Sequence, residues 1–96
     1  MKPAYTVAWP RPLLERMIAE FVLRAMSDGT GSNAVAAAMD EIERRLSSRP
    51  TDVGESRGAN ERVLIVPPLA VTFEVRDADR LVNVLRVSYR PRRPPA

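Results

Sequence analysis

The chain has 96 residues and a net charge of +3 at pH 7, with 45% hydrophobic and 28% charged residues. This length fits one domain, and the hydrophobic fraction supplies enough side chains for a core. The sequence has no cysteine, which excludes a disulfide framework, a thiolate metal site and a thiol nucleophile. It also has no histidine, the commonest general base and metal ligand. Chemistry must therefore use arginine, lysine, tyrosine, hydroxyl, carboxylate or backbone groups, and we expect no cofactor and no metal.

The positive charge is concentrated at the C-terminus. Arg86, Arg90, Arg92 and Arg93 stand there without a nearby acid, so the rest of the chain is close to neutral. All basic residues except Lys2 are arginine, the side chain suited to two-pronged contacts with phosphate or carboxylate. The C-terminal segment is therefore either a binding surface for an anion or a hydrated tail.

The N-terminal stretch MKPAYTVAWPRP lacks the long apolar core of a signal peptide. No run in the chain approaches the roughly 20 apolar residues of a transmembrane helix. We therefore expect a cytoplasmic protein without a membrane segment.

The first half of the chain predicts a strand followed by a helical hairpin. Residues 4–9 are rich in β-branched and aromatic residues, which favours a strand. Residues 12–26 carry one broad apolar stripe, which predicts a helix with Pro12 in its first turn. Residues 27–33 have turn composition, and residues 34–47 again show helical periodicity. We expect Ser32 or Asn33 to cap this second helix.

The second half predicts three strands joined by short connections. Residues 51–60 have the composition of a loop, and RVLIV at 62–66 reads as a strand. Pro67 and Pro68 cannot donate to a sheet and indicate an edge or a tight connection. Residues 69–76 alternate between apolar and polar, residues 77–79 form a turn, and residues 81–89 form the last strand.

The predicted order is β-α-α-β-β-β. Strands with short connections form an antiparallel meander, and the helices must bury their stripes against one of its faces. We therefore expect a two-layer α+β domain, with the helical hairpin packed on a mainly antiparallel sheet. A single domain over residues 1–90 and a basic, proline-rich tail over residues 91–96 complete this prediction.

Few stretches of the chain have a residue pattern that indicates a catalytic or binding site. The glycines at 29 and 31 lack the pattern of a phosphate loop, and the acids at 40–43 fit a solvated helix face. Three candidates remain, namely the loop with Glu55 and Arg57, Arg62 at the start of the meander, and the basic end with Tyr89. Arginines beside a tyrosine suit RNA, because guanidinium groups bind phosphate and an aromatic ring stacks on a base. The alternative is that Tyr89 packs on the helices while the arginines stay hydrated.

The order of these elements resembles the RelE/ParE family of toxins from type II toxin–antitoxin modules, which are also described as plasmid stabilization systems. The resemblance lies in YTVAW, RRLSSRP, GESR, RVLIVPPLAVTFEV and VNVLRVSYRPR, and it covers nearly the whole chain. It implies the β-α-α-β-β-β domain and a cognate antitoxin partner that wraps the toxin and blocks its groove. RelE-like members cut mRNA on the ribosome as mRNA interferases, whereas ParE-like members inhibit DNA gyrase and cut nothing.

The resemblance also implies site residues. A ribosome-dependent endoribonuclease would use Arg62, Tyr89 and Arg92 as catalytic residues, and no metal. In this alignment the middle-strand arginine of RelE-like nucleases falls at Ala70, which counts toward the alternatives, a ParE-like gyrase inhibitor or an inactive member that binds its antitoxin. The frequency of nucleases in the family still favours the endoribonuclease. Whichever holds, the residues expected to contact nucleic acid or the antitoxin are Glu55, Arg57, Arg86, Arg90 and Arg93.

Overall fold

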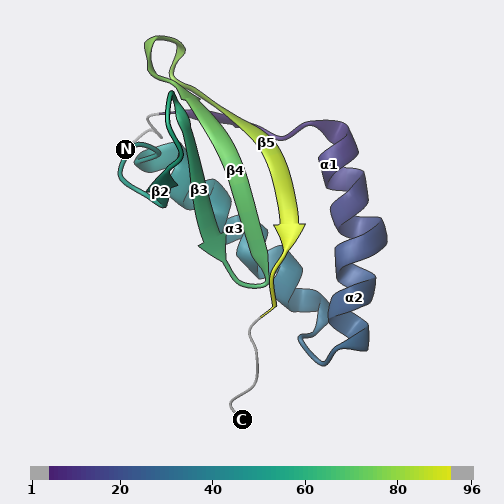
Figure 1. Cartoon of the computed structure of the whole chain (residues 1–96). Helices are drawn as coiled ribbons and strands as arrows, with labels where there is room; N and C mark the ends of the chain where they lie inside the picture. Colours follow the sequence, from purple (N-terminus) through teal and green to yellow (C-terminus); the bar gives the residue numbers. More distant parts are fainter. Residues whose placement is uncertain (1–4, 92–96) are drawn as a thin grey trace.

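The computed structural model describes residues 5–91, which form a five-stranded sheet covered on one face by a helix (Figure 1). The strand order is β1-β5-β4-β3-β2, with β1 parallel to β5 and all other pairs antiparallel. The strands are β1 (Thr6–Ala8), β2 (Glu55–Ser56), β3 (Glu61–Val66), β4 (Leu69–Arg76) and β5 (Leu81–Tyr89). The helical elements are α1 (Arg11–Arg16), the π-helix η1 (Met17–Phe21), α2 (Val22–Ser27), α3 (Ser32–Ser48) and the short η2 (Asp77–Asp79).

The predicted fold class and order of elements are confirmed, with three local differences. The stretch 51–60, expected to be a loop, contains the short strand β2, which pairs with β3. The residue before α3 is Gly31, and neither Ser32 nor Asn33 caps the helix. The first helix contains a π-helical turn at its centre. The proposed boundary between a 1–90 domain and a tail stays a prediction, because residues 92–96 lie outside the described residues.

The core lies between α3, the first helical segment and one face of the sheet. Leu69, Val71, Phe73 and Val75 alternate along β4 and are all buried, as their period of two predicts. The π-helical turn of η1 begins and ends with Met17 and Phe21, each only 1% exposed. With Ala25 they are spaced four residues apart, so they lie on one side of the helix, against the core.

A β-bulge in β5 changes which residues face the core. Thr72 pairs with Arg86 and Phe73 pairs with Val84, so Leu85 is an extra residue in the strand. Before the bulge, Val82 and Val84 are buried; after it, Val87 and Tyr89 are buried. The extra residue therefore turns Arg86 and Ser88 to the open face of the sheet, where an unbroken alternation would have turned them into the core.

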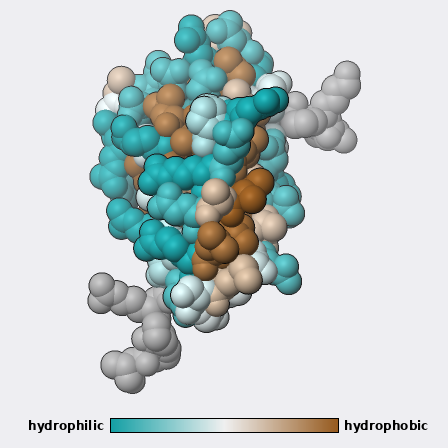
Figure 2. Space-filling model, turned by 90° about the vertical axis from the view of Figure 1, so that its right-hand side faces the viewer, coloured by the Kyte–Doolittle hydropathy of each residue, from teal (hydrophilic) through white to brown (hydrophobic). Residues whose placement is uncertain are grey.

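The outer side of the first helical segment is unusually apolar. Ile18, Leu23 and Met26 are 70%, 61% and 63% exposed. Figure 2, which views the molecule from this side, shows apolar side chains gathered beside a band of hydrophilic ones. In the described part of the chain no helix is long and apolar enough to cross a membrane.

Gly54 fixes the path of the chain into β2. Its φ is +70°, and a Cβ atom there would lie 2.2 Å from the carbonyl oxygen of Val63. Gly58, in the turn that follows, has φ of +92° and open space around the same position. Only Gly54 therefore faces both a conformational and a steric restriction.

We expect Gly54→Ala to destabilise the protein much more than Gly58→Ala. Both changes place a side chain in the left-handed region, at about 1–2 kcal/mol, but only Gly54→Ala adds a clash with the backbone of β3. Urea denaturation of the two variants provides the measurement. Equal losses of unfolding free energy would show that the loop moves aside at no cost.

Candidate binding groove

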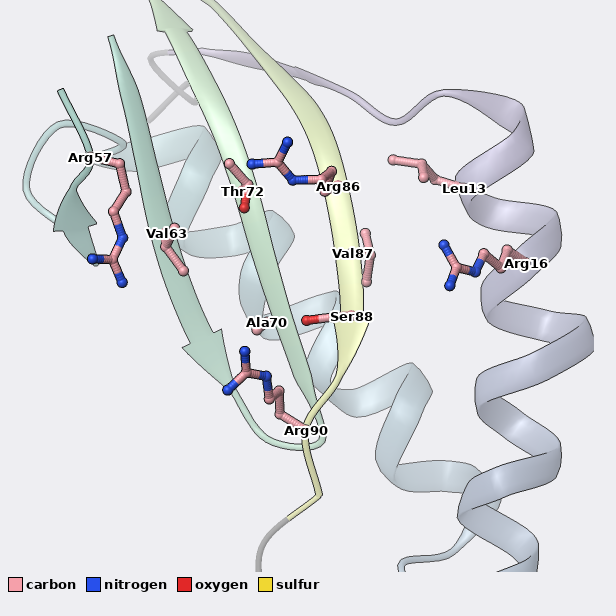
Figure 3. Close-up of a pocket in the computed structure, with 10 residues that line it drawn as sticks. All are labelled: Leu13, Arg16, Arg57, Val63, Ala70, Thr72, Arg86, Val87, Ser88 and Arg90. Atoms are coloured by element: carbon pink, nitrogen blue, oxygen red, sulfur yellow. The ribbon is translucent and has the colours of Figure 1, made fainter. Parts of the chain in front are cut away.

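The open face of the sheet forms the floor of a groove of about 430 Å³, whose side walls come from α1 and from the segment after β2. Its lining residues are drawn in Figure 3. The small side chains Val63, Ala70, Thr72 and Ser88 come from the three central strands and form this floor. The groove also contains four arginines, Arg16, Arg57, Arg86 and Arg90.

Three of these arginines were predicted from the sequence, and the fold brings them together from distant segments. Arg57 follows β2, and its backbone N–H donates to the Glu61 carbonyl at 2.8 Å. Arg86 reaches the groove because of the bulge at Leu85. The backbone N–H of Arg90 donates to the Pro68 carbonyl at 2.5 Å, which ties the end of β5 to the turn between β3 and β4.

Arg16 was not predicted as a site residue. It lies on α1, and Figure 3 shows its side chain directed toward β5. The guanidinium pairs with Glu20 at 3.0 Å and lies over the Phe21 ring, 5.6 Å from its centroid. Arg16 is a charged residue within the predicted helix at 12–26, and only the tertiary structure shows that its side of the helix borders the groove.

The arginines of the groove keep much of their charge available. Arg16 and Arg57 make exposed ion pairs with Glu20 and Glu55, and exposed pairs contribute little binding energy. Within residues 5–91, Arg86 and Arg90 have no carboxylate within ion-pair distance. The groove can therefore bind phosphate or carboxylate groups through charge-assisted hydrogen bonds.

Arg62 lies outside the groove and supports a loop. It pairs with Phe73 of β4, so its side chain is on the face of the sheet that carries the core. Its guanidinium donates to the carbonyl oxygens of Val53 at 2.9 Å and Gly54 at 3.2 Å. These contacts hold the segment that leads to Glu55 and Arg57.

Tyr89 also points away from the groove. Its ring is 8% exposed and stacks on Phe21 with 5.8 Å between the centroids. The hydroxyl donates to Asp28 at 2.6 Å, and the Arg24 guanidinium lies 4.7 Å from the ring centroid. Burial, together with the hydrogen bond to Asp28, raises the pKa of the Tyr89 hydroxyl above its ordinary value. This tyrosine therefore keeps its proton and anchors β5 to the loop between α2 and α3.

The remaining predicted residues contribute less to the described groove. Glu55 is exposed, and one of its carboxylate oxygens lies 3.6 Å from the Arg57 guanidinium. Arg92 and Arg93 lie outside the described residues. No group of three or more acidic side chains within residues 5–91 is placed to hold a metal ion.

Comparison with known structures identifies the architecture. A chain of the toxin–antitoxin complex RelBE2 from Mycobacterium tuberculosis superposes with a TM-score of 0.68, at 20% identity, over 94% of both chains. A chain of the chromosomal ParDE toxin–antitoxin system from P. aeruginosa gives 0.64, at 17% identity, over 93% of this chain and 98% of that one. This is the RelE/ParE toxin fold.

No protein-family model and no curated protein sequence matches the chain. The structure places Ala70, the position aligned with the RelE-like arginine, in the floor of the groove. The floor of the groove, formed by Val63, Ala70, Thr72 and Ser88, therefore carries no ionisable side chain.

The contacts of Asp28 predict a stability change in acid. The Thr30 hydroxyl, the Tyr89 hydroxyl and the Thr30 backbone N–H lower the pKa of Asp28. A lowered pKa in the folded state stabilises the protein above the unfolded pKa of about 3.9, and this contribution is lost as the pH falls through the folded pKa. Asp28→Asn should therefore be less stable than the wild type at pH 7, and the difference should shrink below about pH 4.

Urea denaturation between pH 7 and pH 2 provides the measurement. Tyr89→Phe is the matched control, because it removes the hydrogen bond from the Tyr89 hydroxyl to Asp28 and leaves the one from the Thr30 backbone N–H. It should show part of the same pH dependence. A constant difference between the wild type and Asp28→Asn across this range would contradict the interpretation.

Proposed function

We propose that this chain is the toxin of a type II toxin–antitoxin pair, and that it acts by binding its target rather than by cutting RNA. The observation that carries the proposal is the composition of the groove. Four guanidinium groups surround a floor of small, uncharged side chains, and within residues 5–91 no lining residue of the groove exchanges protons near neutral pH. The fold shared with chains of the RelBE2 and ParDE complexes supports the membership in a toxin–antitoxin module.

RNA cleavage would need a proton acceptor for the 2′-OH and a proton donor for the leaving oxygen. Arginine stays protonated in proteins, so the four arginines can stabilise negative charge but cannot accept the proton. Arg62 and Tyr89, the other catalytic candidates within the described residues, are directed elsewhere. Ala70 removes a further cation from the place where the RelE-like resemblance expects one.

Binding needs only what the groove provides. Guanidinium groups recognise carboxylate and phosphate through paired hydrogen bonds, and a concave basic surface attracts acidic partners at long range. In the ParE-like alternative the target is DNA gyrase. The chain would then inhibit gyrase by binding it through this basic surface. The cognate antitoxin neutralises the chain by covering the same arginines with an acidic segment.

Removing two groove charges should abolish toxicity without unfolding the protein. We expect the double variant Arg86→Gln and Arg90→Gln to weaken target binding about 30- to 150-fold, because replacing a charge-assisted hydrogen bond by a neutral one loses about 1–1.5 kcal/mol at each of the two positions. The measurement is the number of viable cells after induction without an antitoxin. The double variant Arg49→Gln and Arg76→Gln is the matched control, since it removes the same two charges at exposed positions outside the groove. Equal toxicity of all forms would exclude the groove as the active surface.

The mode of action is tested by two assays on one induced culture. Mapping of mRNA 5′ ends on ribosomes reports cleavage, and the topology of a plasmid reports gyrase activity. We expect intact messages and reduced negative supercoiling. Cleaved messages with normal supercoiling would establish the mRNA interferase activity instead. Purified chain at saturation should also inhibit supercoiling by isolated gyrase.

A further inference from the structure

Two hydroxyl side chains, Thr72 and Ser88, lie on the floor of the groove. Thr72 is half-buried on β4, which at this position pairs with β3 on one side and with β5 on the other. Ser88 is exposed on β5, and the strand on the far side of β5, β1, pairs only with residues 81–83. Of the two hydroxyls, Ser88 therefore belongs to a strand that is open on one side, and it lies one residue before the end of that strand.

The Ser88 side chain holds no other part of the fold in place. It makes no hydrogen bond to another residue of the described chain. Because it is exposed, it also adds nothing to the hydrophobic core. The hydroxyl is thus free to react, and its modification breaks none of the contacts that stabilise the domain.

Arginines stand on both sides of Ser88 along the chain. Arg86 precedes it and Arg90 follows it by two residues, and both line the same groove. Positions two residues apart in a strand lie about 7 Å from each other on one face, a span that an extended arginine side chain covers. Figure 3 shows the Ser88 hydroxyl directed across the floor and the Arg90 side chain directed into the same part of the groove. Within residues 5–91 neither arginine has a carboxylate in ion-pair distance, so both can bind a negative group placed on Ser88.

We propose that Ser88 is a phosphorylation site and that a phosphate there closes the groove. The reaction needs ATP and a serine kinase. The Ser88 oxygen bonds to the γ-phosphorus of ATP, and the bond from that phosphorus to the oxygen shared with the β-phosphate breaks. ADP leaves, and the hydroxyl proton passes to a base of the kinase. The arginines on either side of Ser88 suit a kinase whose substrate cleft is acidic.

The open side of β5 gives such an enzyme access. Between residues 84 and 89 no other strand of the described chain pairs with this side of β5. The groove separates this part of the strand from α1, none of whose residues is buried. Only the last residues of β5 need to separate from β4 to bring Ser88 into an active site.

A phosphate on Ser88 uses the arginines on which binding depends. It carries a charge of about −1.5 to −2 at pH 7 and accepts charge-assisted hydrogen bonds from guanidinium groups. Arg86 and Arg90 then bind the phosphate, and the other two arginines of the groove already have carboxylate partners. The contact between phosphate and arginine rests on the geometry of the groove alone, whereas the resulting loss of toxicity rests on the proposed function.

Phosphoserine incorporated at position 88 of the complete chain tests this contact. Its second pKa, ordinarily about 6, is measured by ³¹P NMR. We expect this pKa to fall by about one unit, because nearby guanidinium groups favour the dianion. Phosphoserine in place of Ala78 is the matched control, since that position is exposed and lies between Asp77 and Asp79, which should raise the pKa.

The double variant Arg86→Gln and Arg90→Gln identifies the groups that bind the phosphate. In the chain modified at position 88 it should return the second pKa to about 6. Amide NMR spectra report whether each modified chain is folded. Three results would each overturn the proposal: equal pKa values for phosphate at positions 88 and 78, no response to the double variant, or unfolding caused by the phosphate at position 88.

Mass spectrometry of the chain recovered from the cells that encode it measures the modification itself. We expect a phosphate on the peptide that contains Ser88, both the wild type and Ser88→Ala being recovered from growing and from starved cells. The variant should lack this phosphate. A wild-type peptide without phosphate under both conditions would show that Ser88 is not a phosphorylation site.

Cell viability separates this proposal from the proposed function. The chain with phosphoserine at position 88 should spare the cells in which it is induced, whereas the chain with phosphoserine in place of Ala78 should remain toxic. If the unmodified chain is harmless while the phosphate at position 88 is present and bound by the arginines, the proposed function fails and the phosphorylation site stands. If both modified chains are toxic, the closing of the groove fails and the proposed function stands.

Discussion

The bulge at Leu85 is the constraint on which the candidate site depends. A strand alternates its side chains strictly, so an additional residue exchanges the two faces for everything that follows it. Before the bulge β5 fills the core, and after it Val87 and Tyr89 continue to do so while Arg86 faces the groove. The same strand therefore supplies both the hydrophobic centre of the fold and part of its basic surface.

The groove depends on two kinds of groups. Its arginine side chains can bind a partner, and other contacts hold the backbone that carries these arginines in place. Tyr89 is buried against Phe21 and donates to Asp28, and these contacts fix the end of β5 from the core side. The backbone of Arg90 is held by the turn between β3 and β4. Arginine side chains are long and lose much conformational freedom on binding, so a fixed backbone reduces the cost of directing them into one groove.

The sequence predicts the layers of this fold well because hydrophobic periodicity reports burial directly. The alternation of Leu69, Val71, Phe73 and Val75 identifies β4 and its buried face. Periodicity does not predict an element that forms only because a distant part of the chain packs or pairs with it. β2 is formed by two exposed residues and exists because β3 offers them a partner. The sequence contains a sign of the bulge, because two consecutive residues, 84 and 85, are both apolar. The prediction of an antiparallel meander treated residues 81–89 as one strand and did not use this sign.

The site is predicted less completely for the same reason. Arg57, Arg86 and Arg90 were identified from local composition and from the resemblance, and the fold assembles them. Arg16 belongs to a helix that borders the sheet, which no local pattern reveals. Arg62 and Tyr89 have the residue types that catalysis requires, yet their direction depends on which face of the strand each occupies.

The position of Arg62 affects how mutational screens of this protein should be read. Its guanidinium satisfies two backbone carbonyls of the segment before β2, and that segment carries Arg57 to the groove. A substitution at position 62 would therefore reduce activity by loosening the loop, and in a screen it would look the same as the loss of a reacting group.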